Sequence, residues 1–320
     1  MKMKVALNLL PVILLLVFTL QSCQKELSPE TTTTPTTPTT PDSNYIAKIY
    51  EIEVNGTVAD TVDIAVYNYD NLKRVVSIIR SSFNLYYYPS ITYTYLYNAA
   101  DTLPYRSTFI SKSAYDAAQT QFYYDTVVSY HNYDNFGKNI KDSMIHSAYY
   151  IMSPVPYTVN SEVRNYSYGT RKIFGLIAYS TIFPSGTSSG DDKDTAITDA
   201  TGNIIDNKIY RFNPSNSLFE LDATSNFTFD TKASPFSRLS NFKTYGVFPS
   251  GETLFYEFPQ YFNRLTQNEH HSFSGGSGTY FNSTYSNSYN SNGLLKEVLI
   301  YDVPPFPSTY AKESFIYKSL

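Results

Sequence analysis

Alternating apolar and polar positions recur along most of this chain and predict β-strands. Residues 61–69 (TVDIAVYNY) show the pattern most clearly. One face of this strand would carry Val62, Ile64 and Val66, and the other Asp63, Ala65, Tyr67 and Tyr69. Further strands are expected over 45–54, 75–79, 85–97, 105–111 and 122–133. No long helical periodicity follows the first 22 residues.

The corners between these strands share a sequence form. Tyr-x-Tyr ends one strand, Asp-Asn makes the turn, and a basic residue precedes the return strand, as in residues 66–78. The fullest copy spans 130–138, where Gly137 can supply a positive φ. Later variants lie at 166–171, 210–216 and 289–296. Because Asp and Asn can hydrogen-bond their own backbone, Asp70 and Asn71 are expected to serve the turn rather than a ligand.

These elements predict an all-β fold. We expect a large curved antiparallel sheet, either packed as two layers or wrapped as a barrel-like meander of hairpins, with at most one or two short helices. One domain would span 45–320. The polar stretch 184–194 (PSGTSSGDDKD) reads as a long loop and a candidate sub-boundary, and 229–263 as a short helix or irregular segment closing one end of the sheet.

Composition narrows the function classes. The chain has 320 residues with Tyr 32, Phe 21 and Trp 0, and tyrosine suits half-buried strands. The net charge of −4, without basic runs, argues against a nucleic-acid partner. The absence of tryptophan weighs against a sugar-processing cleft. The single cysteine, Cys23, excludes an intramolecular disulfide.

The N-terminus has the order of an export signal. Residues 1–22 combine a charged start with an apolar core, and Leu20-Gln21-Ser22-Cys23 resembles a bacterial lipobox, although a small or aliphatic residue is commoner where Gln21 stands. The resemblance implies cleavage between Ser22 and Cys23 and lipidation of Cys23, which would make the membrane a partner through the acyl chains. Residues 23–44 then form a tether that contains TTTTPTTPTTP.

Residues Gln24-Lys25-Glu26 partly resemble the surface-export signal of Bacteroidota lipoproteins. The same residues are equally compatible with the solvated start of a linker. The resemblance implies an outer-membrane protein that faces outward, and the periplasmic face remains the alternative.

The Tyr-x-Tyr-Asp-Asn corners resemble YD repeats. Together with the lipobox, the Thr/Pro tether and the segment 229–236 (FDTKASPF), they are similar to a family of uncharacterised Bacteroidota surface lipoproteins. The resemblance covers most of 45–302 and implies an antiparallel β architecture at the cell surface. It implies no activity, so no functional residues are carried over.

Candidate catalytic and metal motifs are weak. Residues 186–190 (GTSSG) have the letters of a nucleophile elbow but lack its strand–helix context. Asp191, Asp192 and Asp194 offer oxygen ligands for Ca²⁺, but EF-hand spacing fails, which favours a solvated loop. The histidines lack zinc spacing and are expected at the surface or in packing: His131, His146, His270 and His271. No cofactor is expected.

Asp-Ser/Thr-aliphatic triplets resemble the acceptor for O-glycosylation in exported Bacteroidota proteins. The acceptors would be Thr61, Thr102, Thr126, Ser143 and Thr195. A structural origin is the stronger interpretation, because an Asx turn followed by a strand produces the same triplets.

We therefore expect a lipid-anchored, non-enzymatic binding module at the cell surface. Its extracellular ligand, whether glycan, peptide or protein, is not indicated by any motif. Two alternatives stay open at this point: a carrier that holds a hydrophobic ligand on a concave β face, and a hydrolase with its site in the 184–200 or 250–271 loops.

Overall fold

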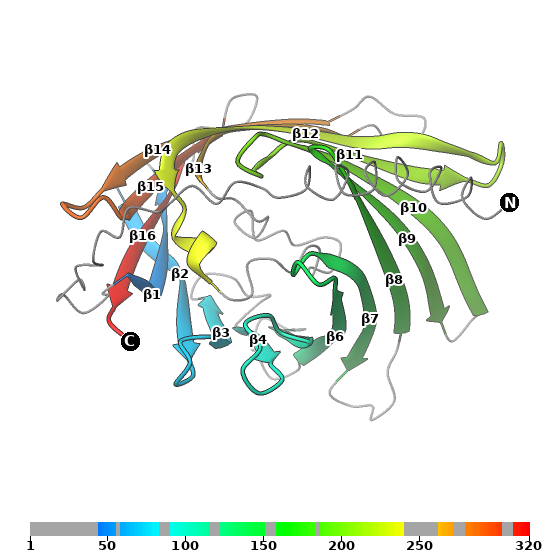
Figure 1. The fold of residues 1–320 in the computed structure, drawn as a ribbon, viewed down its shortest axis with the longest axis horizontal. Helices are drawn as coiled ribbons and strands as arrows, with labels where there is room; N and C mark the ends of the chain where they lie inside the picture. The colour runs from blue at the N-terminus through cyan, green and yellow to red at the C-terminus, as the bar shows by residue number, and fades with distance from the viewer. Residues whose placement is uncertain are drawn as a thin grey trace, which may run out of the picture. The chain divides into compact units, whose positions relative to one another are not determined.

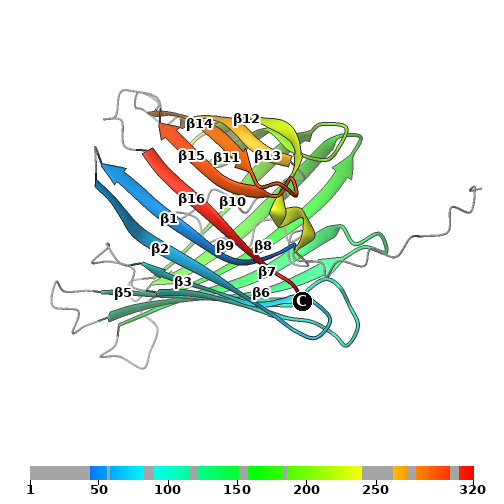
Figure 2. The same ribbon diagram turned by 90° about the vertical axis from the view of Figure 1, so that its left-hand side faces the viewer.

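The computed structural model describes residues 44–55, 58–82, 90–114, 122–150, 158–183, 186–239, 262–271, 279–302 and 310–320. In this part of the chain, sixteen strands form one closed antiparallel barrel (Figures 1 and 2). Each strand pairs with its neighbours in sequence, and the pairing of β1 with β16 closes the sheet. The all-β prediction is confirmed, and the barrel-like meander is the form that it takes.

The first eight strands are 7 to 12 residues long. They are β1 (Tyr45–Asn55), β2 (Val58–Tyr69), β3 (Val75–Ser82), β4 (Ser90–Leu96), β5 (Arg106–Ala114), β6 (Phe122–Tyr133), β7 (Asn139–Tyr150) and β8 (Thr158–Gly169). The remaining strands are β9 (Lys172–Phe183), β10 (Gly186–Thr198), β11 (Ile204–Asn213), β12 (Leu218–Ala233), β13 (Phe262–His271), β14 (Thr279–Tyr289), β15 (Leu295–Asp302) and β16 (Tyr310–Lys318).

The loop expected over 184–194 is wrong for the part that the structure describes. Residues 186–198 form β10, which pairs with β9 along its whole length. A run of Gly, Ser and Asp disfavours strands in isolation, but pairing with β9, and with β11 from Asp192 onward, overrides that preference. Tyr179 lies across Gly190, where an added Cβ would come within 2.4 Å of its hydroxyl. The small residue therefore makes room for an aromatic ring on the neighbouring strand.

The hairpin connections divide between two rims, because a meander places alternate turns at opposite ends. One rim, here called the corner rim, carries the turns that lead from even-numbered to odd-numbered strands. Its tight turns lie at 70–74, 134–138, 170–171, 199–203 and 290–294. On the other rim, the described turn is 214–217. Gly137 has a φ of 73° in its corner, as predicted.

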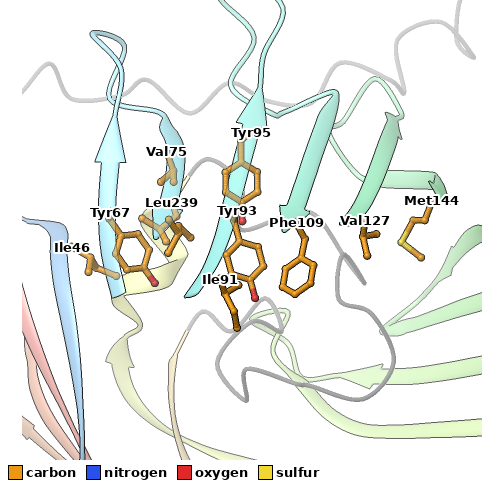
Figure 3. Close-up of a cluster of buried hydrophobic side chains, with 11 residues drawn as sticks. Ile46, Tyr67, Val75, Ile91, Tyr93, Tyr95, Phe109, Val127, Met144 and Leu239 are labelled. Carbon is orange, nitrogen blue, oxygen red and sulfur yellow. The ribbon is translucent and has the colours of Figure 1, made fainter. Parts of the chain in front are cut away.

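The main core lies on the inner wall of the first strands. Inward-facing apolar side chains from β1 to β7 form one cluster, which Figure 3 shows projecting from successive strands. Its members include Tyr67, Ile78, Tyr93, Phe109 and Val127, and register places these five directly opposite one another. Tyr93 and Phe109 make a ring contact with centroids 5.2 Å apart. The row is a cross-strand aromatic and aliphatic ladder.

One short 3₁₀ helix, η1 (Pro235–Arg238), follows β12. Ser234 caps it by accepting a hydrogen bond from the Phe236 N–H, and Leu239 beyond it packs into the main cluster. This agrees with the expected short helix in 229–263, although residues 240–261 lie outside the described part. No helix among the described residues is long and apolar enough to cross a membrane.

Candidate functional site

The tyrosines of the repeated corners tie neighbouring hairpins together. In five places a tyrosine near the end of a strand donates its hydroxyl to a backbone carbonyl 22 to 29 residues earlier. The pairs are Tyr69 with Ile46 (2.8 Å), Tyr97 with Val75 (2.7 Å), Tyr133 with Pro104 (2.8 Å), Tyr168 with Asn139 (2.6 Å) and Tyr317 with Leu295 (2.6 Å). The tyrosine near the strand end is thus a structural residue, both in Tyr-x-Tyr (Tyr69, Tyr97 and Tyr168) and where another residue stands two positions before it (Tyr133 and Tyr317).

The Asx residue of each corner holds its own turn. Asp70 Oδ1 accepts hydrogen bonds from the N–H groups of Leu72 and Arg74, both at 2.9 Å. The same bonds to the second and fourth following residues recur at Asp134, Asp199 and Asn290. The expectation that Asp70 serves the backbone is confirmed. Partial burial acts to raise the pKa of Asp70, but the hydrogen bonds and charge of Arg74 outweigh it and hold the pKa below its usual value.

The basic residue after the corner reaches the adjacent repeat. The Arg74 guanidinium lies 4.5 Å from the ring centroid of Tyr97, and Lys138 Nζ lies 5.1 Å from that of Tyr168. Arg74 also donates to the carbonyl oxygens of Ala99 and Asp101. The tyrosine, the aspartate and the basic residue of the unit therefore each have a partner in the protein, which assigns them to the fold and not to recognition. The exposed Asn71 side chain makes no hydrogen bond within the described part of the protein, so its expected role in the turn stays a prediction.

A series of buried polar side chains, linked by hydrogen bonds, crosses β5, β6 and β7 on the inner wall. Ser107 Oγ lies 2.9 Å from His131 Nε2, and His131 Nδ1 lies 2.7 Å from Asp142 Oδ1. Asn139 donates to the same carboxylate at 2.7 Å, and Tyr166 donates to its other oxygen at 3.1 Å. The order serine, histidine, aspartate matches that of a hydrolytic triad.

The surroundings of Ser107, His131 and Asp142 do not suit a catalytic nucleophile. Ser107 is 3% exposed, and the side chains of His131 and Asp142 are 0% exposed. Ser107 is the second residue of β5 and pairs with Tyr95 on β4 and Ser129 on β6, so its backbone belongs to the strand ladder and not to a turn or helix N-terminus that could supply an oxyanion hole. These three side chains satisfy one another's hydrogen bonds in a buried position and order the packing of three strands. His131 is a packing residue, as the sequence suggested.

A row of charged side chains continues from Asp142 around the inner wall. Register places the following residues opposite one another from β7 to β12: Asp142, Arg164, Ile177, Asp192, Arg211 and Glu220. Arg164 pairs with Glu162, and Arg211 Nε lies 3.0 Å from Asp222 Oδ2. Opposite charges on adjacent strands stabilise the sheet and give the interior a polar sector.

Asp194 is a carboxylate in this sector whose charged form is poorly stabilised. Its Oδ1 atom is buried without a hydrogen-bond partner in the described part of the protein. Burial raises the pKa of Asp194 to about 6, against the opposing effect of Arg164. Burial also raises the pKa of Asp192, whose Oδ1 is likewise unpartnered among the described residues. Both carboxylates are thus costly to ionise.

Comparisons with known proteins identify no family. No family model and no curated protein matches the sequence. Among solved structures, the chain is similar to a porin-like protein from Bacteroides vulgatus, with 8% identity, a TM-score of 0.42 and coverage of 86% of this chain and 99% of that one. It is also similar to a porin-like protein from Bacteroides uniformis, with 12% identity, a TM-score of 0.44 and coverage of 85% and 96%.

The barrel assignment therefore rests on the strand pairing of this chain. The resemblance to lipoproteins with YD-like hairpins stays a prediction. So do the cleavage and lipidation at Ser22 and Cys23 and the export signal at 24–26, which lie outside the described residues.

The three candidate calcium ligands do not form one site. They lie on β10, where side chains alternate, so Asp192 and Asp194 face the inner wall and Asp191 faces outward. No group of three or more potential metal ligands occurs among the described residues. The GTSSG segment is part of the same strand and has no strand–turn–helix context. In the proposed hydrolase loops 184–200 and 250–271, residues 186–198 and 262–271 are strands and residues 199–200 begin a tight turn. Residues 184–185 and 250–261 lie outside the described part.

The candidate O-glycosylation sites differ in access. Thr61 and Thr102 are exposed, whereas Thr126, Ser143 and Thr195 are half-buried within strands. Modification of these residues stays a prediction.

Sequence reasoning missed the chain Ser107–His131–Asp142. Its members lie 24 and 11 residues apart, on three strands, and only the strand register brings them together. No local motif announces such a contact. His146 was also missed as a partner of Asp125, at 3.4 Å on the same inner wall.

The outer face of β10 to β14 carries many polar residues at mid-strand, although Tyr210 and the exposed Leu221 also lie on it, in register with Lys193. Its outward positions include Asp191, Lys193, Asp206, Lys208, Asn226, Asn268 and Ser286. On the outer face of β3 to β9, exposed aliphatic residues such as Ile79, Ile110 and Ile145 occur. Hydroxyl side chains interrupt them in the same cross-strand rows, among them Thr92, Thr126 and Ser161.

Proposed function

We propose that the protein is a non-catalytic binding module, held at the outer membrane by acyl chains on Cys23, with its barrel in water at the end of the Thr/Pro tether. The polar outer face of β10 to β14 carries this proposal. A barrel that spans a membrane presents a continuous apolar band about 25 Å tall to lipid, and a Lys at mid-bilayer costs about 2–4 kcal/mol. Lys193 and Lys208 stand at mid-strand positions of the outer face.

The tether supports the same arrangement. Residues 31–41 (TTTTPTTPTTP) consist of Thr and Pro alone and contain no apolar segment that could pack. An extended chain of this length spans about 30 Å at about 3.1 Å per residue. A lipid anchor of this kind would hold the protein at the membrane without requiring lipid to contact the polar outer face of β10 to β14.

The remaining alternatives have less support from the described residues. A serine hydrolase would need an accessible nucleophile, and Ser107 is buried. A carrier would need a free apolar wall, but the apolar cluster on β1 to β7 is already buried, and Leu239 packs against it. The non-catalytic proposal therefore fits the inner wall as well as the outer one.

Cell fractionation tests the position of the barrel. The full chain is compared with a variant in which residues 1–23 are replaced by a cleavable secretory signal, so that no lipid is attached. We expect the full chain in the outer-membrane fraction and the variant in the soluble fraction as a monodisperse protein without detergent. A variant that stayed in the membrane pellet and required detergent would contradict the proposal.

A further inference from the structure

Three asparagines form a row on the outer face of the barrel. Asn226 on β12 pairs directly with Asn268 on β13, which pairs with Asn282 on β14. Asn226 and Asn268 are exposed, and Asn282 is half-buried. We call these three residues the carboxamide ladder. Neighbouring strands lie about 4.8 Å apart, so the ladder repeats an amide at that spacing.

The ladder has no evident structural purpose. Asparagine is depleted in strands because it packs poorly on a pleated surface. Within the described part of the chain, none of the three side chains makes a hydrogen bond. Several buried or half-buried asparagines of the barrel do have partners: Asn139 with Asp142, Asn203 with Asp199, Asn263 with the Lys232 carbonyl and Asn287 with the Arg264 carbonyl. The exposed Asn165 on β8 resembles the ladder in having no side-chain hydrogen bond within the described part of the protein, but it stands outside the ladder. Three adjacent strands thus carry an unfavourable residue without an internal contact that would offset it.

The row on one side of the ladder extends the same chemistry, whereas the row on the other side holds Thr224 and His270 with Lys208 at its end. Thr228, Thr266 and Thr284 form the next row, and the hydroxyls of Thr228 and Thr266 lie 2.7 Å apart. That row continues to Tyr301 on β15, which is 41% exposed. At the other end of the ladder, Asp206 pairs with Asn226. The patch therefore combines amides and hydroxyls with one carboxylate at an end and one aromatic ring at an edge.

We propose that the carboxamide ladder binds a neutral glycan, an inference that rests on the proposed role as a binding module. A carboxamide both donates and accepts hydrogen bonds, as a sugar hydroxyl does, so a row of amides can engage successive hydroxyls of a polysaccharide. Tyr301 offers an apolar ring with a polar tip at the edge. The ladder and its threonine row carry no charge, which does not suit a strongly charged polymer. They also lack the buried apolar centre of a protein–protein interface.

The test uses the full lipidated chain in liposomes and an array of neutral oligosaccharides, followed by calorimetry with the strongest hit. Asn268→Val removes the central amide and substitutes a residue that favours strands. Asn165→Val is the matched control, because Asn165 is exposed on the outer face of β8, away from the ladder. Equal melting temperatures of the two variants exclude a folding defect.

We expect a neutral oligosaccharide to bind, Asn268→Val to weaken binding by about tenfold or more, and Asn165→Val to leave it unchanged. Loss of one hydrogen bond of about 1.4 kcal/mol corresponds to that factor. Failure of every neutral oligosaccharide to bind would overturn the inference, as would binding that Asn268→Val leaves intact. Self-association of the protein abolished by Asn268→Val would also overturn it, since the ladder would then contact a second copy. None of these results bears on the fractionation test of the barrel's position.

Discussion

The hydroxyl of Tyr133 donates a 2.8 Å hydrogen bond to the backbone carbonyl of Pro104, 29 residues earlier in the chain. Pro104 is fully buried, so its carbonyl is shielded from water, and the tyrosine provides the partner that such a group requires. The bond joins the corner after β6 to the start of β5. Four further tyrosines make the same connection around the corner rim, which explains why the Tyr-x-Tyr element recurs.

Tyr133→Phe should destabilise the barrel by about 1–3 kcal/mol, the cost of leaving a buried acceptor without a partner. Chemical denaturation of the variant and of the wild-type protein measures the difference. Tyr130→Phe is the control, because Tyr130 is 45% exposed on the outer face of the same strand. Equal effects of the two substitutions would show that the hydroxyl of Tyr133 has no special role.

The hydrogen bonds of the Asx corner predict that two substitutions of Asp134 differ in their effect on stability. Its Oδ1 accepts two backbone N–H bonds at 2.8 Å, from Phe136 and Lys138. Asn290 makes the equivalent bonds in its own corner, so Asp134→Asn should be tolerated. Asp134→Ala removes both bonds and should cost about 1–2 kcal/mol, in the range of a lost helix cap. Thermal unfolding of both variants measures whether the asparagine variant is more stable than the alanine variant. Equal stability of the two variants would refute the prediction.

Asp194 predicts a pH-dependent stability. Its pKa is raised from 3.8 to about 6 in the folded protein, so the folded state binds more protons than the unfolded state between these values. Stability contributed by this group is fully present below about pH 3.8 and is lost as the pH rises through about 6. Asp194→Asn should therefore raise the melting temperature at pH 7.5 and change it little at pH 4.

The matched control for this prediction is Asp191→Asn, on the outward face of the same strand. Asp191→Asn should leave the difference in melting temperature between pH 7.5 and pH 4 as it is in the wild-type protein. If Asp194→Asn lowered the melting temperature at pH 7.5, the attraction between Asp194 and Arg164 would outweigh the cost of burial, and the assigned direction would be wrong.

The burial of Ser107 predicts that this residue does not act as the nucleophile of a serine hydrolase. Because the residue is 3% exposed and lacks an oxyanion hole, the folded protein should not react with a fluorophosphonate probe. Ser107→Ala should destabilise the protein by about 1–3 kcal/mol, since it leaves His131 Nε2 buried without its partner. Labelling of the wild-type protein that disappears in Ser107→Ala would instead identify an active nucleophile.

Local sequence predicted the hairpin units well. Alternation located β2 and β6, and the Asx corner at Asp70 was interpreted correctly, since both signals are local in the chain. Closure of the sheet was not predictable, because it depends on β1 pairing with β16, at opposite ends of the domain. The strand over 186–198 was missed for a related reason: its composition favours a loop, and only pairing with β9, and with β11 from Asp192 onward, overrides that preference.

The candidate site was less accessible to sequence reasoning. The carboxamide ladder joins positions 226, 268 and 282, and no motif relates them before the register of β12, β13 and β14 is known. The same holds for Arg164 and Asp192, which face one inner wall from strands on either side of β9.

The central claim is that the barrel stands in water while the lipid holds the protein at the membrane. Spin-label accessibility in liposomes tests it most directly, with single labels at Leu176, which is 46% exposed on β9, and at Ser286, which is exposed on β14. We predict that both labels collide more with a water-soluble nickel chelate than with oxygen. Labels that meet oxygen and are protected from the chelate would lie in lipid, and that result would contradict the claim.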